Sequence, residues 1–108
     1  MISAASIDNL IETYKKYGWE PRRLLLRDTI KTGLDDSITD VPVRTSNIDA
    51  VWFSRPRQPE RTPWELRHLG ETPFSLLEHL DENSEDFEEQ LSDIEHRMAE
   101  SIDARKQA

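Results

Sequence analysis

The chain has 108 residues, which is enough for one ordinary domain and too few for two. It contains no cysteine, which excludes disulfide frameworks, thiolate nucleophiles and Cys-based metal sites. The formal net charge of -8 arises entirely within residues 78–108, because residues 1–77 hold equal numbers of acids and bases. An acidic third of the chain repels a phosphate backbone, so we expect no nucleic-acid partner.

Two patterns bear on the compartment in which the protein works. Residues 1–5 lack both the basic and the apolar stretch of a signal peptide. No apolar run approaches the roughly 18 residues that a membrane span needs. We therefore expect a cytoplasmic protein.

The first predicted element is an amphipathic helix. Its apolar residues recur at spacings of three and four, along one helical face: Ile7, Leu10, Ile11, Tyr14 and Tyr17. Ser6 suits the N-cap of this helix and Gly18 suits the position after its end. Residues 19–28 follow as a predicted strand, because Pro21 forbids a continuing helix and a short leucine run lies between arginines.

Residues 29–47 carry the weakest pattern, since turn-forming residues dominate them. So long a loop is unusual in a compact domain, and part of it is expected to form a helical turn or an edge strand around residues 41–43. A hairpin comes next, with strands at residues 48–55 and 64–69. The three prolines of residues 56–63 suit an irregular loop between these strands.

Two helices are predicted to close the chain. Thr72 and Pro73 form an N-cap and first-turn pair, and apolar residues follow at helical spacing from Phe74 to Leu80. Ser84 then caps a long acidic helix that runs to residue 106. The apolar residues of that helix step by four, three, four and four, close to a coiled-coil seam: Phe87, Leu91, Ile94, Met98 and Ile102.

These elements predict one α+β domain over residues 1–108. It has an N-terminal helix, a small antiparallel sheet of three or four strands, one short helix and one long C-terminal helix. We expect the first helix and the start of the last helix to cover the same face of the sheet. Trp52 and Trp64 lie on neighbouring strands with opposite orientation relative to Val51, which predicts that one of them is exposed as a binding surface.

The long C-terminal helix, residues 84–106, is the most informative feature for function. Its seam either lies along the sheet or extends past it to meet another chain, because a helix of about 20 residues spans about 30 Å, the width of a small domain. The second reading makes the chain a non-enzymatic interaction or assembly module, expected to form a homodimer or to bind another protein. Its contact residues would be Leu91, Ile94, Met98 and Ile102.

A second candidate surface combines arginines with tryptophans on the predicted hairpin. Its members are Arg55, Arg57, Arg67, Trp52 and Trp64. Arginine beside an aromatic ring can stack on bases and bind phosphates. The alternative is an ordinary solvated sheet face, whose arginines pair with the acidic helices.

A third candidate is a carboxylate site. Asp49 opens the second predicted strand and Glu65-Leu66-Arg67 lies on the third, after one helix and before another. This arrangement, over roughly residues 5–80, resembles the PD-(D/E)XK nucleases, although Arg67 stands where that family carries lysine. The resemblance implies that Asp49 and Glu65 would hold a divalent metal that activates water, provided that their carboxyl groups converge.

The remaining residues give little further chemistry. His68 follows Glu65 by three positions and His96 follows Asp93 by three, the spacing of carboxylate–histidine metal pairs on helices. No glycine-rich phosphate loop is present; we expect no bound cofactor, and catalysis is unsupported by the sequence rather than excluded. A third functional hypothesis is a small-molecule binder with a pocket under residues 29–47.

Overall fold

A computed structural model of the chain describes residues 4–33, 41–55, 62–70 and 74–107. Its elements follow one another in the order α1 (Ala4–Lys16), β1 (Glu20–Leu26), α2 (Asp28–Gly33), β2 (Val43–Thr45), β3 (Ala50–Ser54), β4 (Thr62–His68), β5 (Ser75–Leu80) and α3 (Phe87–Gln107). The predicted α+β class is confirmed, with a five-stranded sheet in place of the expected three or four strands. No helix within the described ranges is both long enough and apolar enough to cross a membrane.

The strands lie in the order β2-β1-β3-β4-β5. All neighbours are antiparallel except β1 and β2, which run parallel with Leu24 opposite Val43. The sheet is therefore mixed, and the prediction of a purely antiparallel sheet is wrong. After α2 the chain enters β2 with Val43 opposite Leu24 and runs in the same direction as the last three residues of β1.

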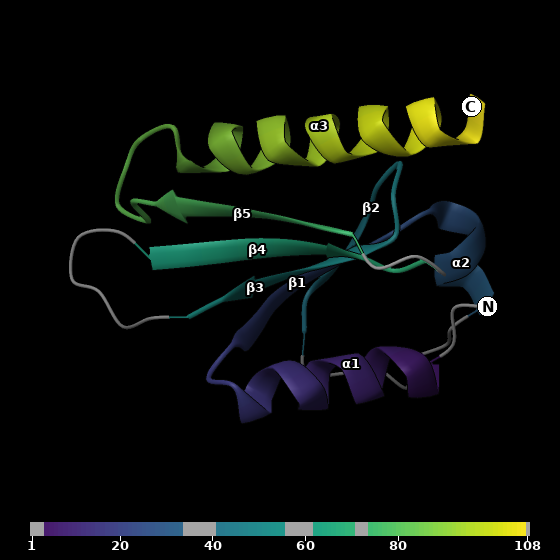
Figure 1. Cartoon of the computed structure of the whole chain (residues 1–108), viewed down its shortest axis with the longest axis horizontal. Coiled ribbons are helices and arrows are strands. Elements are labelled where there is room, and N and C mark those ends of the chain that lie inside the picture. Colours follow the sequence, from purple (N-terminus) through teal and green to yellow (C-terminus); the bar gives the residue numbers. More distant parts are fainter. Residues whose placement is uncertain (1–3, 34–40, 56–61, 71–73, 108) are drawn as a thin grey trace.

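The two long helices lie on opposite faces of the sheet, as Figure 1 shows, with α3 above the strands and α1 below them. The expectation that they share one face is wrong. The central strands carry apolar side chains at consecutive positions, so both faces need a cover. On β1, Leu25 packs in the cluster under α3, whereas Leu24 and Leu26 pack in the cluster under α1.

The α1 layer begins as the sequence predicts. Ile7 and Ile11 are buried against the sheet, and Gly18 adopts a positive φ of 88° just after the helix. The amide of Gly18 donates to the carbonyl of Lys15, and the amide of Trp19 donates to the carbonyl of Tyr14. These two bonds form a Schellman motif, which ends the helix and turns the chain into β1.

The segment after β4 is the main error of the sequence prediction. Residues 75–80 form the strand β5, not a short helix. Backbone pairing with β4 over the whole strand, with Leu76 opposite Leu66, outweighs the helical propensity of its leucines. The weaker prediction for residues 29–47 is confirmed where the structure describes them, because α2 supplies the helical turn and β2 the edge strand.

The helix α3 begins at Phe87, three residues after the predicted cap at Ser84. Its first turn is fixed to the sheet through Glu88, which accepts a 2.9 Å hydrogen bond from Nη1 of Arg23 and lies 3.7 Å from Nη1 of Arg44. The Arg23 hydrogen bond holds the pKa of Glu88 below its usual value. The helix is therefore fastened to β1 at its N-terminal end.

Candidate functional site

The least covered part of the sheet is the side of β4 and β5 that faces away from α3. On β5, Ser75, Leu77 and His79 are exposed and share this face, because Leu77 lies opposite Glu65 in the register with β4. Leu77 is 52% exposed and Tyr17 is 68% exposed, and these two are the exposed large hydrophobic residues among the described positions. The side chains of Leu76 and Leu80 point to the other face, where they pack under α3.

β5 is also an edge of the sheet, since β4 is its one neighbour in the strand order. The amide of His68 donates to the carbonyl of Phe74, which makes this pair hydrogen-bonded. Hydrogen-bonded pairs alternate along an antiparallel ladder, so Leu76 and Glu78 also bond to β4. The N–H and C=O groups of the alternate residues point away from β4. These residues are Ser75, Leu77 and His79.

The edge of β5 lacks three of the devices that usually block strand addition, although it carries one charged side chain, Glu78, which pairs with Arg97 of α3. Its sequence, SLLEHL, contains neither proline nor lysine, and its pairing with β4 runs without a register shift. The opposite edge strand, β2, has three residues, two of which are exposed. β5 is therefore the longer and more regular of the two edges.

A polar network borders this face on the side of α1. The ring of Tyr14 stacks on Phe53 at a centroid distance of 3.9 Å, and its hydroxyl donates a hydrogen bond to Oε2 of Glu65. Burial, together with the hydrogen bond and negative charge of Glu65, raises the pKa of Tyr14. The Glu65 carboxylate therefore has a structural partner, and it fixes α1 to β4.

The seam of α3 lies along the sheet. Leu91, Ile94 and Met98 are buried in the cluster on that face, and Ile102 packs against it while staying partly exposed. Their surroundings are the side chains of Trp52, Trp64 and other residues of the same chain. Leu91, Ile94 and Met98 are thus core residues of this chain, and Ile102 lies at the margin of the core.

The structure does not bring the arginines and tryptophans of the second candidate together. Trp52 and Trp64 are 0% and 3% exposed, under α3, with ring centroids 5.9 Å apart. Arg67 lies opposite Val51, whose side chain belongs to the face under α1, so it points to the other side of the sheet. Arg55 follows Ser54 at the end of β3, and Arg57 lies outside the described residues.

The expectation of one exposed tryptophan is therefore wrong. The register places Trp52 opposite Leu66, two residues from Trp64, so that both indoles point into the same core. Nε1 of Trp52 donates a 2.8 Å hydrogen bond to Oε2 of Glu95 on α3. The guanidinium of Arg22 lies 5.4 Å from the centroid of the Trp64 ring and covers its outer part.

The carboxyl groups of Asp49 and Glu65 do not converge. Glu65 lies opposite Phe53 on β3, and Phe53 is four residues from Asp49 along the chain. At the usual rise of a strand, four residues separate the two backbone positions by about 13 Å. Asp49 is 3% exposed and accepts hydrogen bonds of 2.8 Å from the backbone amide and from Nε of Arg27. The two residues therefore do not fit the shared metal that the nuclease resemblance implies.

No group of three or more histidine, aspartate or glutamate side chains gathers as a metal site would within the described ranges. Of the histidine pairs at metal-ligand spacing, His96 lies 3.4 Å from Oε1 of Glu100, one turn further along α3. His68 lies at the end of β4, where its backbone pairs with Phe74. Neither arrangement brings a second carboxylate to the imidazole.

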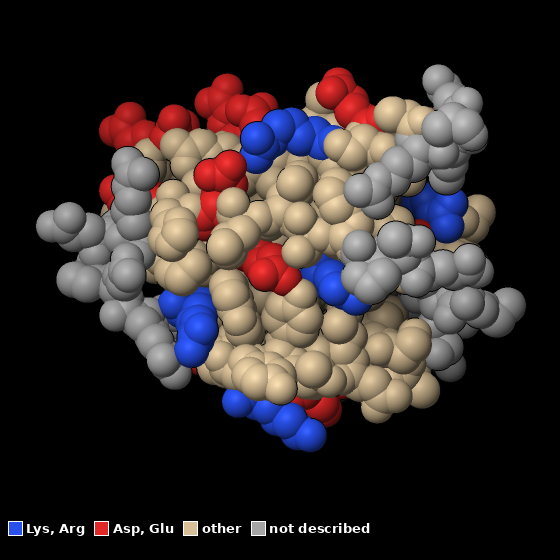
Figure 2. Space-filling model, in the orientation of Figure 1, with Lys and Arg blue, Asp and Glu red and all other residues tan. Residues whose placement is uncertain are grey.

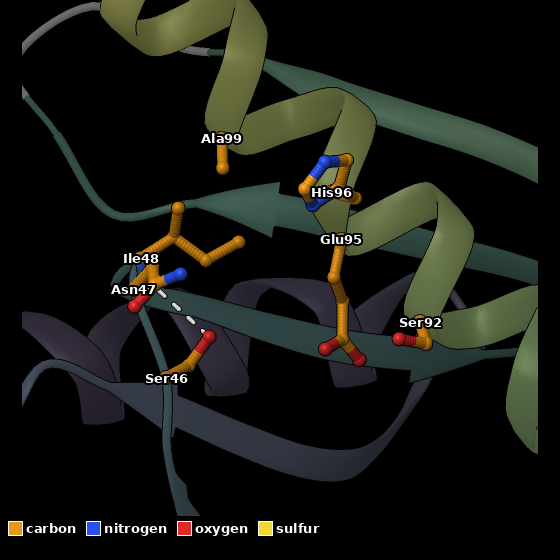
Figure 3. A pocket seen from close by; sticks show the side chains of 7 residues that line it. All are labelled: Ser46, Asn47, Ile48, Ser92, Glu95, His96 and Ala99. Atoms are coloured by element: carbon orange, nitrogen blue, oxygen red, sulfur yellow. Dashed lines mark hydrogen bonds between the residues drawn. The ribbon is translucent and has the colours of Figure 1, made fainter.

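A small pocket lies between the connection from β2 to β3 and the middle of α3 (Figure 3). Its volume is about 130 Å³, and its lining residues are Ser46, Asn47, Ile48, Ser92, Glu95, His96 and Ala99. Pockets that enclose a metabolite-sized ligand usually measure about 300–1,000 Å³. This one has room for roughly four water molecules.

The charge of the surface is divided between the layers. In the space-filling view of Figure 2, acidic side chains gather along α3 at the top, whereas both signs occur over the sheet. Arg97 of α3 forms a 3.1 Å ion pair with Glu78 of β5, and this pair links the helix to the edge strand. The acidic side of the molecule is therefore the one formed by α3 and the turn that precedes it, and β5 lies beside it.

Comparison of the chain with protein-family models, curated proteins and solved structures finds no match. The geometry alone therefore supports the choice of site. The edge of β5 was missed by sequence reasoning, although Phe74, Leu76 and Leu80 recur at even spacing, which is the period of a strand.

Proposed function

We propose that the chain is a non-enzymatic protein-interaction module, and that its interaction surface is the outer edge of β5 with the exposed side chain of Leu77. The observation that carries this proposal is a regular six-residue edge strand with an exposed leucine at its centre. An edge of this kind binds a partner by strand addition. The main-chain hydrogen bonds then provide affinity, and alternate side chains provide specificity.

The energetics favour a contact of moderate strength. Leu77 is about half exposed, so covering it contributes about 1 kcal/mol at the usual value for a leucine side chain. Each new main-chain hydrogen bond adds about 0.5–1.5 kcal/mol net. Ser75, Leu77 and His79 each offer one donor and one acceptor. Such an edge suits reversible association better than permanent assembly.

The proposal keeps the expected class of function and moves the surface from α3 to β5. It is supported by the burial of Leu91 and Met98 in the core, which removes most of the seam of α3 from the surface. The small-molecule hypothesis concerns a pocket under residues 29–47, of which residues 34–40 lie outside the described ranges; the pocket beside Glu95 is a separate one and, at about 130 Å³, is smaller than a metabolite site usually is. The separation of Asp49 and Glu65 opposes the nuclease-like alternative.

The test is an NMR titration of the ¹⁵N-labelled chain with a synthetic peptide that carries its own residues 74–81. We expect the amide signals of β5 and β4 to shift as the peptide adds to the edge. Leu77→Pro removes the outward N–H without breaking a bond to β4, so it should weaken binding several-fold. Leu77→Val keeps that N–H and is the matched control. Shifts confined to α3, or no shifts at all, would contradict strand addition.

A further inference from the structure

We infer that the strand received by β5 is β5 of a second copy of the chain, paired antiparallel about a two-fold axis at Leu77. This inference rests on the proposed function, because it uses the same free edge. It names the partner and fixes the register of the pairing. The result is a continuous sheet of two chains, in which each β5 changes from an edge strand to an interior strand.

The hydrogen-bonding groups of β5 are complementary to themselves in this register. The outward N–H and C=O groups belong to Ser75, Leu77 and His79, a set that is symmetric about Leu77. When Leu77 lies opposite its own symmetry mate, Ser75 lies opposite His79 of the other copy. Both N–H and C=O groups of each such pair are then exchanged, as in an ordinary antiparallel ladder.

The side chains favour the same register. With the axis at Leu77, the exposed leucines of the two copies become direct cross-strand neighbours and cover each other. The residues that face one another carry no like charges, because serine meets histidine and Leu76 meets Glu78. Moving the axis by one residue, to Glu78, would place two glutamates directly opposite each other, which is destabilising. It would also leave the outward N–H and C=O groups of Ser75 without a partner residue on the other copy of β5.

The acidic helices set the salt dependence of this pairing. α3 packs on β4 and β5, so joining two β5 strands brings two α3 helices near the two-fold axis. Residues 78–108 carry the whole net charge of -8, and α3 itself holds six acids and three bases, so the two helices carry net charge of the same sign and repel each other. Salt screens charges at the surface over about 8–10 Å. Added sodium chloride should consequently strengthen the dimer, whereas a contact made by ion pairs would weaken.

Disulfide trapping tests the register, because the natural chain has no cysteine. In the proposed dimer, the Cα atoms of residue 77 in the two copies lie about 5.5 Å apart. That distance falls within the range of about 4.4–6.8 Å that a disulfide spans. Leu77→Cys should therefore form a covalent dimer on mild oxidation. Ser75→Cys should not, because its mate lies about 13 Å away, four residues along the strand.

Two further variants complete the experiment. The double variant with Ser75→Cys and His79→Cys keeps Leu77 and should form two crosslinks per dimer, since these positions face each other. Tyr17→Cys introduces a thiol at a more exposed position away from β5 and measures crosslinking by random collision. The inference predicts that light scattering shows a dimer for the natural chain. It predicts crosslinks for Leu77→Cys and for the double variant, and only background crosslinking for Ser75→Cys alone and for Tyr17→Cys.

The outcomes separate this inference from the function on which it rests. A natural chain that binds the β5 peptide but remains monomeric refutes the second copy as partner and leaves strand addition standing. A dimer in which Ser75→Cys crosslinks as well as Leu77→Cys refutes the register. A monomer that also fails to bind the peptide refutes both proposals. A dimer that dissociates when salt is added contradicts the predicted repulsion between α3 helices.

Discussion

Replacement of Met98 by alanine tests whether the seam of α3 belongs to the core. Met98 is fully buried in the cluster between α3 and the sheet, beside Leu91 and Ile94. Truncation of such a side chain removes its transfer free energy and leaves a cavity, which together cost about 2–5 kcal/mol. For a chain of this length, that loss corresponds to a fall in Tm of roughly 10–20 °C.

The assay is urea unfolding followed by tryptophan fluorescence, because Trp52 and Trp64 lie in the same cluster as Met98. Asp93→Ala, on the exposed side of α3, is the control and should change the free energy of unfolding by less than about 0.5 kcal/mol. The mass in solution should be the same for both variants as for the natural chain. A Met98→Ala variant that keeps its stability but loses association would refute the assignment of the seam to the core.

Three further substitutions test other contacts. Gly18→Ala should lower the free energy of unfolding, measured with urea, by about 1–2 kcal/mol, because φ is 88° there and a Cβ is strained in that region. An unchanged free energy of unfolding would contradict the positive φ at the end of α1. Asp49→Asn should cost about 1–3 kcal/mol, since it weakens two partly buried hydrogen bonds from Arg27 to a buried side chain. A neutral result would show that this contact is dispensable. The raised pKa of Tyr14 means that the stability from its neutral hydroxyl is complete below about pH 10 and is lost as the pH rises further. Tyr14→Phe should remove that loss above about pH 10, and an unchanged pH profile would contradict the pairing with Glu65.

Local patterns were sufficient for much of the fold. The spacing from Ile7 to Tyr14 and the glycine at position 18 located α1, and the prolines at 56 and 59 separated the two hairpin strands, whereas Pro63 lies within β4. These features depend on residues near one another in sequence, where capping and turn chemistry act directly. The class of the fold followed from them.

The errors came from contacts between distant residues. Phe74, Leu77 and Leu80 fit a helix, whereas Phe74, Leu76 and Leu80 fit a strand, and the segment alone does not decide between these patterns. Pairing with β4 decides it, and that pairing makes Leu77 the exposed member. The candidate site lay within this ambiguity.

The same physics explains why the sequence could not place the residues of the other candidate sites. Whether Asp49 and Glu65 meet depends on the register between β3 and β4, which the sequence does not state. Whether Trp52 shares a face with Trp64 depends on that register as well. The seam of α3 looked too long for one small domain, but a five-stranded sheet covers it, because β5 adds the strand that the sequence prediction had replaced by a helix.

Amide hydrogen exchange, measured by NMR at low and at high protein concentration, tests the central claim most directly. Leu76 and Glu78 donate to β4, so their amides should exchange slowly at both concentrations. The amides of Ser75, Leu77 and His79 point outward and should exchange quickly when the chain is dilute and slowly when it is concentrated. Fast exchange of these three amides at every concentration, in a chain that nevertheless associates, would contradict the assignment of the β5 edge as the interaction surface.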